Sequence, residues 1–307
     1  MLQYLIILLD DTSVSFCHYE NPKTERKLIS LSDLQAAILF AMKENLMIQF
    51  VYPNYELPVE YKAEIETIDH NKIMPSVANS ETADVVVFNG FSDFASNCLS
   101  AEKAFVVRTT KQELFSNSEK ITQALEKVTR LNIVITDVET FTETDFSAYK
   151  NALEKLSLEL KNLFAKGLSP QLNILTDRLM LDKMNNCNAG VENITLAPNG
   201  KFYICPAFYL EDETDSVGDL ANGLNIKNKQ LYKLDHAPLC RICDAYQCKR
   251  CIWLNRTTTL EVNTPSHEQC VVAHLERNAS RELLLYFPEK EIKEIEYLDP
   301  FDIKEEF

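Results

Sequence analysis

The sequence lacks residue patterns that are typical of several common protein functions. It has only six glycines among 307 residues, and none forms a Gly-rich phosphate loop, so nucleotide binding of the usual kinds is not expected. No apolar run approaches the roughly 20 residues needed to span a membrane, and the N-terminus lacks the basic region and cleavage site of a signal peptide. We therefore expect a cytoplasmic protein with no membrane partner, whose cysteines stay reduced.

Basic residues are also scarce. Lys and Arg total 31 against 46 Asp and Glu, which gives a formal net charge of −15. Binding to phosphate backbones needs clustered Lys and Arg, so nucleic acid is not an expected partner. The acidity is explained by solubility, with attraction of a basic peptide or partner as the alternative.

Residues 1–180 alternate between apolar strand-like runs and amphipathic helical stretches. The runs are rich in Val, Ile and Phe and are apolar almost throughout, as in strands buried on both faces of a parallel sheet. Helices are clearest over residues 30–44, which begin at a capping serine, and over 142–166. The predicted strands are Leu2–Leu9, Met47–Tyr52, Asp84–Asn89, Phe105–Thr109, Leu131–Thr136 and Gln171–Thr176. This alternation predicts an α/β domain with a parallel sheet, either open or curled into a partial barrel.

Residues 181–285 do not show this alternation of strands and helices, and they contain seven of the nine cysteines. Helical periodicity fades there, and Ala197-Pro-Asn-Gly200 followed by Lys201–Cys205 predicts a β-hairpin with a tight turn. Residues 286–307 form an acidic C-terminal tail. The seven cysteines are Cys187, Cys205, Cys240, Cys243, Cys248, Cys251 and Cys270.

The four central cysteines are spaced C-x2-C-x4-C-x2-C. Thiols grouped this closely in a chain with no export signal are expected to bind metal, with disulfides as the competing interpretation. Zinc ribbons place a dozen or more residues between their two C-x2-C knuckles, whereas four residues separate Cys243 from Cys248. Four thiolates from so short a run would crowd one ion, so we expect the cysteines to be split between two iron–sulfur sites, with zinc as the alternative.

The order of the cysteines resembles the SPASM domain, the C-terminal cluster-binding extension of radical SAM peptide-modifying enzymes. That domain has a cysteine, a G-x4-C hairpin, a compact run that is commonly C-x2-C-x5-C-x3-C, and a closing cysteine. This chain has Cys187, Gly200-x4-Cys205, the central run and Cys270, although the last two gaps of its run are each one residue shorter. Val217-Gly-Asp-Leu220 also resembles the family's short Gly-Asn/Asp-Leu segment.

The resemblance implies two auxiliary [4Fe–4S] clusters that share these ligands. One cluster would take Cys240, Cys243, Cys248 and Cys270. The other would take Cys187, Cys205 and Cys251, with a fourth ligand from Cys98, Cys17, a histidine such as His236, a substrate thiolate, or none. An open iron site would suit a peptide cysteine, because thiolate is a natural ligand of iron–sulfur clusters, whereas a ligand lost from a non-functional relic is the alternative.

The motif that holds the catalytic cluster of radical SAM enzymes, C-x3-C-x2-C after the first strand, is missing. The corresponding loop contains only Cys17, with Asn21 and Thr24 where the other two ligands would follow. No Gly-Gly-Glu follows the second predicted strand, where such enzymes bind the amino group of S-adenosylmethionine (SAM). We therefore do not expect this chain to use SAM.

Several acidic and histidine residues are further site candidates. Asp10, Asp11 and Glu20 follow the first predicted strand and could line a pocket there, although we expect a solvated acidic loop. His267 and His274 flank Cys270 and could be ligands, although polar surface residues are the expected interpretation.

Together these features predict a partial (β/α)6 barrel of radical SAM type over residues 1–180, followed by a small SPASM-like domain over 181–285. Residues 8–22 also resemble the opening of the CXXX repeat peptide maturases. The resemblance implies a role in maturing a ribosomally synthesised, cysteine-rich peptide, by binding the precursor or relaying electrons beside an active maturation enzyme. The alternatives are a maturase that acts through an open auxiliary cluster without SAM, and a structural zinc-binding interaction protein. Whether the chain is itself an enzyme stays open.

Overall fold

A computed structural model describes residues 2–77, 80–92, 94 and 99–287. Cys98 and residues 288–307 of the acidic tail lie outside this part of the chain. Contacts divide the chain into two units, which are described separately. Among the described residues, unit 1 comprises those of 2–87 and 188–236, and unit 2 comprises those of 88–187 and 237–287.

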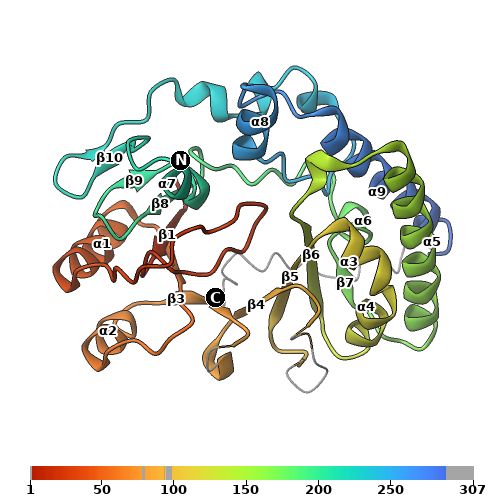
Figure 1. Cartoon of the computed structure of the whole chain (residues 1–307), viewed down its shortest axis with the longest axis horizontal. Coiled ribbons are helices and arrows are strands. Elements are labelled where there is room, and N and C mark those ends of the chain that lie inside the picture. Colours follow the sequence, from red (N-terminus) through yellow and green to blue (C-terminus); the bar gives the residue numbers. More distant parts are fainter. Residues whose placement is uncertain (1, 78–79, 93, 95–98, 288–307) are drawn as a thin grey trace. The chain divides into compact units, whose positions relative to one another are not determined.

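Helices and strands alternate along most of the chain (Figure 1). The helices are α1 Leu31–Glu44, α2 Val59–Ile65, α3 Lys111–Ser116, α4 Ser118–Leu125, α5 Glu143–Ala165, α6 Asp177–Met180, α7 Pro206–Glu211, α8 Ile252–Thr259 and α9 His267–Leu284. The strands are β1 Tyr4–Leu8, β2 Met47–Val51, β3 His70–Pro75, β4 Val85–Asn89, β5 Ala104–Thr109, β6 Arg130–Ile135, β7 Gln171–Leu172, β8 Asn193–Leu196, β9 Phe202–Tyr203, β10 Gly218–Asp219 and β11 Gly223–Leu224. Within the described ranges, every helix is too short or too polar to cross a membrane.

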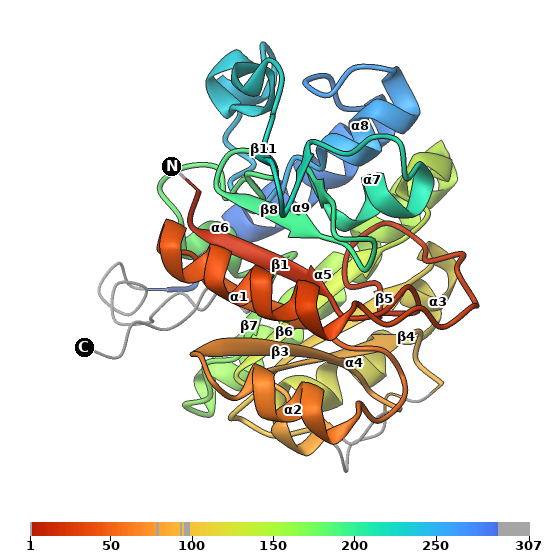
Figure 2. The same cartoon turned by 90° about the vertical axis from the view of Figure 1, so that its left-hand side faces the viewer.

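The sheet of unit 1 is mostly parallel. Its strands follow the order β4-β3-β2-β1-β8-β9, and all neighbours are parallel except the β8–β9 hairpin. Strand β1 has a parallel partner on each side, with Tyr4 opposite Met47 of β2 and Asn193 of β8. Figure 2 shows β1 and β8 side by side. Leu5 and Ile7 are therefore fully buried, as expected for the centre of a parallel sheet.

Helix α1 forms where the sequence predicts a capped helix. The hydroxyl of Ser30 accepts a hydrogen bond from the Asp33 N–H, and this satisfies one of the free donors of the first turn. Its buried residues, Leu34, Ala37, Ile38 and Ala41, follow the helical spacing of one apolar face. The predicted helix over residues 30–44 is confirmed.

Unit 2 contains the parallel strands β5, β6 and β7 and the two long helices α5 and α9. Helix α5 begins at a capping box, in which Thr142 and Asp145 bond to each other's backbone N–H groups. Helices α5 and α9 lie side by side (Figure 1). The Tyr149 hydroxyl of α5 donates to Glu276 of α9 over 2.8 Å, and both side chains are buried.

The α/β class and the mostly parallel sheet are confirmed, as is the β8–β9 hairpin. The six predicted strands correspond to β1, β2, β4, β5, β6 and β7. Strand β3 was not predicted, because His70, Asn71 and Lys72 are polar and only half-buried. The last predicted strand is shorter than expected, because the Thr176 hydroxyl binds the backbone of Leu172 and turns the chain there.

The Gly-Asp segment after the hairpin needs its glycine. Gly218 has φ 132°, and a Cβ atom there would lie 2.1 Å from the Gly223 carbonyl oxygen across the β10–β11 pair. The Asp219 carboxylate accepts the N–H groups of Ala221 and Asn222 over 2.9 and 2.7 Å, and so closes the turn.

We expect Gly218→Ala to lower the free energy of unfolding by about 2–3 kcal/mol, because the new methyl group collides with backbone. Gly223→Ala is the matched control. Its Cβ meets nothing within 4 Å, so only the positive φ of 77° costs energy, about 1 kcal/mol. Urea unfolding of both variants measures the difference, and equal losses would contradict the predicted collision.

Candidate metal centre

The structure places six of the seven candidate cysteines in unit 2 and Cys205 in unit 1. Cys205 immediately precedes α7, and its carbonyl accepts the Phe208 N–H over 3.2 Å. Each cysteine in the described part of the chain is a free thiol. The six in unit 2 are Cys187, Cys240, Cys243, Cys248, Cys251 and Cys270.

Cys187 reaches the central run through backbone hydrogen bonds. The Asn185 N–H donates to the Tyr246 carbonyl over 2.8 Å, and the Cys187 N–H donates to the Lys249 carbonyl over 3.0 Å. These two bonds hold the segment before β8 alongside the run, although more than 50 residues separate Cys187 from Cys240 in the sequence.

The central run folds as a series of tight turns. Cys240 opens a short 3-10 helix, and its carbonyl accepts the Cys243 N–H over 3.1 Å. The Cys248 N–H donates to the Ala245 carbonyl over 2.9 Å. Arg250 has a positive φ of 45°, and this turn separates Cys248 from Cys251, the N-cap of α8.

The folded chain places four thiols close enough to influence one another's pKa, and we call them the first cysteine group: Cys240, Cys243, Cys248 and Cys270. Burial raises the pKa of Cys240 to about 11, and repulsion from the Cys270 and Cys243 thiolates adds to it. Burial also raises the pKa of Cys248 to about 12, with further repulsion from Glu276, Cys240 and Cys270. The pKa of Cys270 is raised by burial and by Cys243. Each member thus faces at least one other member.

Cys187 and Cys251 form a second cysteine group. Burial raises the pKa of Cys251 to about 12, and the Cys187 thiolate is the next largest cause. The Cys251 sulfur accepts the Leu254 N–H over 3.4 Å, as the N-cap of α8. In the first group, the Cys243 sulfur accepts the Ala245 N–H over 3.4 Å. Backbone donors of this kind stabilise sulfur that carries negative charge.

Arg250 interacts with members of both groups and is 1% exposed. Burial lowers the pKa of its guanidinium, and the thiolates of Cys187, Cys240 and Cys248 raise it. Its Nε donates to Asn186 over 3.3 Å, and another guanidinium nitrogen donates to Asn263 over 3.1 Å. Sequence reasoning missed Arg250, although a basic residue directly before a candidate ligand is a signal that was present.

His274 is closer to the candidate centre than expected. Its Nε2 lies 3.5 Å from the Cys243 sulfur, and the residue is half-buried, so His274 is a surface residue with a contact to a candidate ligand. His267 conforms to the expected interpretation as a polar surface residue, because its side chain is 70% exposed. Helical spacing accounts for the contact, since His274 lies four residues after Cys270 on α9 and so on the same face.

The donor set suits an iron–sulfur group. Both cysteine groups offer reduced sulfur only, with N–H donors to sulfur and a buried cation beside them. Throughout the described ranges, no three or more His, Cys, Asp or Glu side chains converge as a ready-made site for one metal ion. The ligand role of the cysteines therefore rests on their chemistry and grouping, and it stays a prediction.

The loop after β1 in unit 1 is built differently from the expected solvated acidic loop. Asp10 is fully buried and Asp11 is 8% exposed, so that expectation is wrong for both, while Glu20 is exposed. Asp10 accepts the Tyr55 hydroxyl over 2.8 Å, and Asp11 accepts the Tyr209 hydroxyl. These bonds satisfy the two carboxylates within the protein.

Asn21 occupies a position where a radical SAM enzyme would carry a cluster ligand. Its side-chain amide donates to the carbonyls of Asp11 and Ser13, over 2.8 Å in each case. Cys17 is half-buried in the same loop. The loop is thus held by hydrogen bonds between its own residues, and Asn21 has a structural task there.

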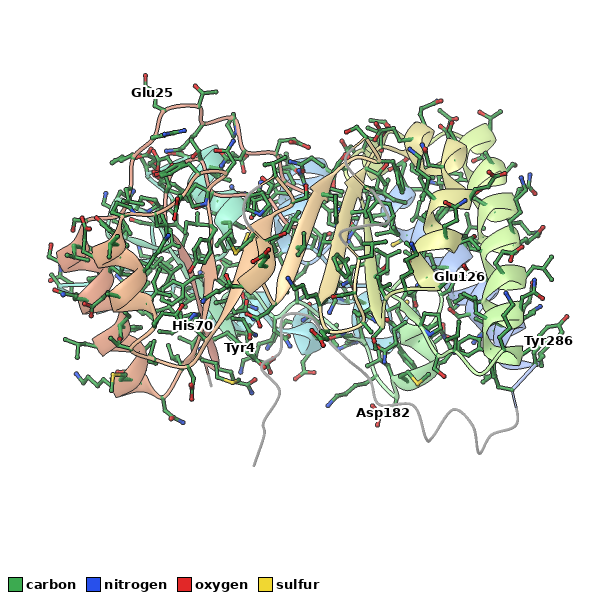
Figure 3. The ribbon with its side chains drawn as sticks, turned by 90° about the horizontal axis from the view of Figure 1, so that it is seen from below. Tyr4, Glu25, His70, Glu126, Asp182 and Tyr286 are labelled. Carbon is green, nitrogen blue, oxygen red and sulfur yellow. The ribbon has the colours of Figure 1, made fainter. Side chains whose placement is uncertain are left out.

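Unit 1 also has an open polar depression of about 570 Å³. It is lined by charged and polar residues that include Glu66, His70 and Asp84. His70, labelled in Figure 3, opens β3. Ligands of parallel sheets bind beyond the carboxyl ends of the strands, so a depression at the amino ends is not assigned to the candidate centre.

No protein-family model and no curated protein matches the chain. Solved structures do match. The chain is similar to native anSMEcpe, an anaerobic sulfatase-maturating enzyme, with bound AdoMet (TM-score 0.65, 13% identity, 95% of this chain and 100% of that chain). It matches the same protein with bound AdoMet and Cp18Cys peptide (TM-score 0.65, 12% identity, 96% and 100%) and a histidine-tagged form of it (TM-score 0.57, 10% identity, 95% and 96%). The likeness shows the fold, which is the α/β fold of radical SAM type expected from the sequence.

Proposed function

We propose that this chain is an iron–sulfur protein of the radical SAM/SPASM type that takes part in maturing a cysteine-rich peptide without cleaving SAM itself. The first cysteine group would hold one [4Fe–4S] cluster. Cys187 and Cys251 would take part in holding a second. Cys205, which the resemblance adds to these two, is a prediction from the sequence alone. The bound clusters would supply one-electron transfer and iron to which a peptide thiolate can bind.

The grouping of the cysteines carries this proposal. The resemblance to SPASM domains divides them into Cys240, Cys243, Cys248 and Cys270 on one side and Cys187, Cys205 and Cys251 on the other. The repulsions that raise the thiol pKa values in unit 2 run within these same two sets, and this supports the proposal. Spacing in the sequence does not require that division, because Cys248 and Cys251 are near neighbours in the run and fall in different groups.

The surrounding residues have defined tasks in this proposal. Arg250 would offset the negative charge of the thiolates, because it faces members of both groups and is almost fully buried. The N–H groups of Ala245 and Leu254 would orient the Cys243 and Cys251 sulfurs. His274 would restrict access of water to Cys243, which it contacts.

A SAM-cleavage assay tests the part of the proposal that says this chain does not cleave SAM. The protein, purified without oxygen and given SAM, a strong one-electron reductant and a cysteine-rich peptide, should form no 5′-deoxyadenosine above a protein-free control. The β1 loop supports this expectation, because Asn21 binds backbone carbonyls of the loop and Asp10 binds Tyr55. Formation of 5′-deoxyadenosine by the isolated chain would overturn the non-catalytic role.

Cys17→Ala tests the same loop through metal content. Cys17 lies in unit 1 in a loop held by Asn21 and the two buried aspartates, so we expect iron and sulfide per chain to stay at the wild-type level. Elemental analysis after anaerobic purification measures it. A loss of iron from this variant would show that the N-terminal half holds a cluster.

A further inference from the structure

Three arginines of unit 2 converge on one carboxylate, that of Asp244. Arg277 donates to one carboxylate oxygen over 2.9 Å, Arg178 donates to the other over 3.2 Å, and Arg281 also bonds to that second oxygen. Arg178 comes from α6, and the other two come from α9. We call these three residues the arginine cluster.

The arginine cluster has many more donors than acceptors. Each guanidinium offers five N–H donors. Over the described part of the chain, Arg281 uses one of them, Arg277 uses two, on Asp244 and Asn278, and Arg178 uses two on Asp244. Three positive charges face one negative charge, so the cluster is locally positive in a chain of net charge −15.

The cluster begins beside the candidate metal centre. Asp244 directly follows Cys243, and the Cys243 sulfur contacts His274. His274, Arg277 and Arg281 are spaced by three and four residues, so they share one face of α9. At 1.5 Å per residue, that face leads about 10 Å along the helix from the histidine to Arg281.

Exposure shows which of the three is available to a ligand. The side chain of Arg281 is 53% exposed, against 22% for Arg277 and 13% for Arg178. An ion pair so exposed contributes little to folding, so Arg281 is not needed to hold Asp244 in place. The two inner arginines hold the carboxylate, and the outer one presents donors to solvent.

We propose that the arginine cluster binds the carboxylates of a short acidic segment of the peptide whose maturation this chain serves. The inference rests on the proposed function. Arginine recognises carboxylates with paired N–H donors, and two or three guanidiniums can take one or two further acidic side chains. A whole acidic protein is a poorer occupant, because the net charge of −15 repels it beyond this small patch. A peptide held here would place a nearby thiol within reach of Cys243 and His274.

The test compares two synthetic peptides that each contain two cysteines, one with flanking glutamates and one with glutamines at the same positions. Fluorescence anisotropy with the full-length chain, purified with its metal, should give an affinity at least about tenfold higher for the glutamate peptide at low salt. Arg281→Glu should remove that preference. Lys155→Glu on α5 makes the same charge change at an exposed position that is not bonded to Asp244, and it should weaken binding less than about twofold.

Iron and sulfide content separates this inference from the proposed function. Arg281→Glu with wild-type iron, an unchanged unfolding midpoint and no glutamate preference supports the peptide site. Equal affinity of the wild type for both peptides, or an equal loss in Arg281→Glu and Lys155→Glu, overturns the site whatever the iron content. A wild-type chain that binds no iron overturns the proposed function, and peptide affinity is then read independently.

Discussion

Replacing Cys240 with alanine is expected to remove about half of the iron and sulfide from the protein, which corresponds to one [4Fe–4S] cluster of two. Cys240 is the most buried of the seven candidates, at 7% exposed, and it faces Cys243, Cys248 and Cys270. The first cluster would lose one of its four thiolate ligands, and the methyl group of alanine cannot replace it as a ligand. Elemental analysis and acid-labile sulfide after anaerobic purification measure the loss.

Loss of the cluster in Cys240→Ala should also destabilise the fold around it. The turns between Cys240 and Cys251 are held by few backbone bonds, so the proposed cluster would contribute much of their stability. Faster hydrogen exchange over residues 240–251 in Cys240→Ala is therefore expected. Cys251→Ala is the matched comparison, because it should spare the first group and remove the other half of the iron. Full iron retention in Cys240→Ala would exclude Cys240 as a ligand.

Replacing Asp177 with alanine is expected to lower the free energy of unfolding by about 3–5 kcal/mol. Asp177 at the start of α6 forms a two-pronged ion pair with Arg130 at the start of β6. The side chains are 0% and 2% exposed, so removing the carboxylate leaves a buried guanidinium without its counter-charge. Urea unfolding of the variant beside the wild type, in the same metal state, measures the effect.

The matched control is an ion pair of the same unit that is open to water. The Lys166 Nζ lies 3.6 Å from the Glu126 Oε1, and the side chains of Glu126 and Lys166 are 50% and 62% exposed. Solvent screens such a pair, so Glu126→Ala should cost less than about 1 kcal/mol. If Asp177→Ala also lowers the free energy of unfolding by less than about 1 kcal/mol, the Arg130 guanidinium must find water or another acceptor, and the prediction is wrong.

Much of the fold follows from local pattern. Buried parallel strands need apolar residues on both faces, and β1, β2, β4, β5 and β6 carry that pattern plainly. Strand β3 does not, because its first half is polar and its place in the sheet is fixed by pairing with β2 and β4. Pairing with neighbours is information that a local pattern lacks.

The candidate centre was predictable only in its sulfur residues. Cysteine spacing predicts thiolate ligands, and the resemblance supplies their division. Arg250 and His274 gain their meaning from contacts with cysteines that the folded chain brings together, which residue spacing does not reveal. The burial of Asp10 and Asp11 depends in the same way on Tyr55 and Tyr209, which follow them by more than 40 and more than 190 residues.

The most direct test of the account is the content of iron, zinc and sulfide per chain in protein purified without oxygen, with its absorbance near 400 nm. Two clusters predict about eight iron and eight sulfide per chain, with broad charge-transfer absorption. Zinc without sulfide or that absorption would contradict the account and leave a zinc-stabilised interaction protein.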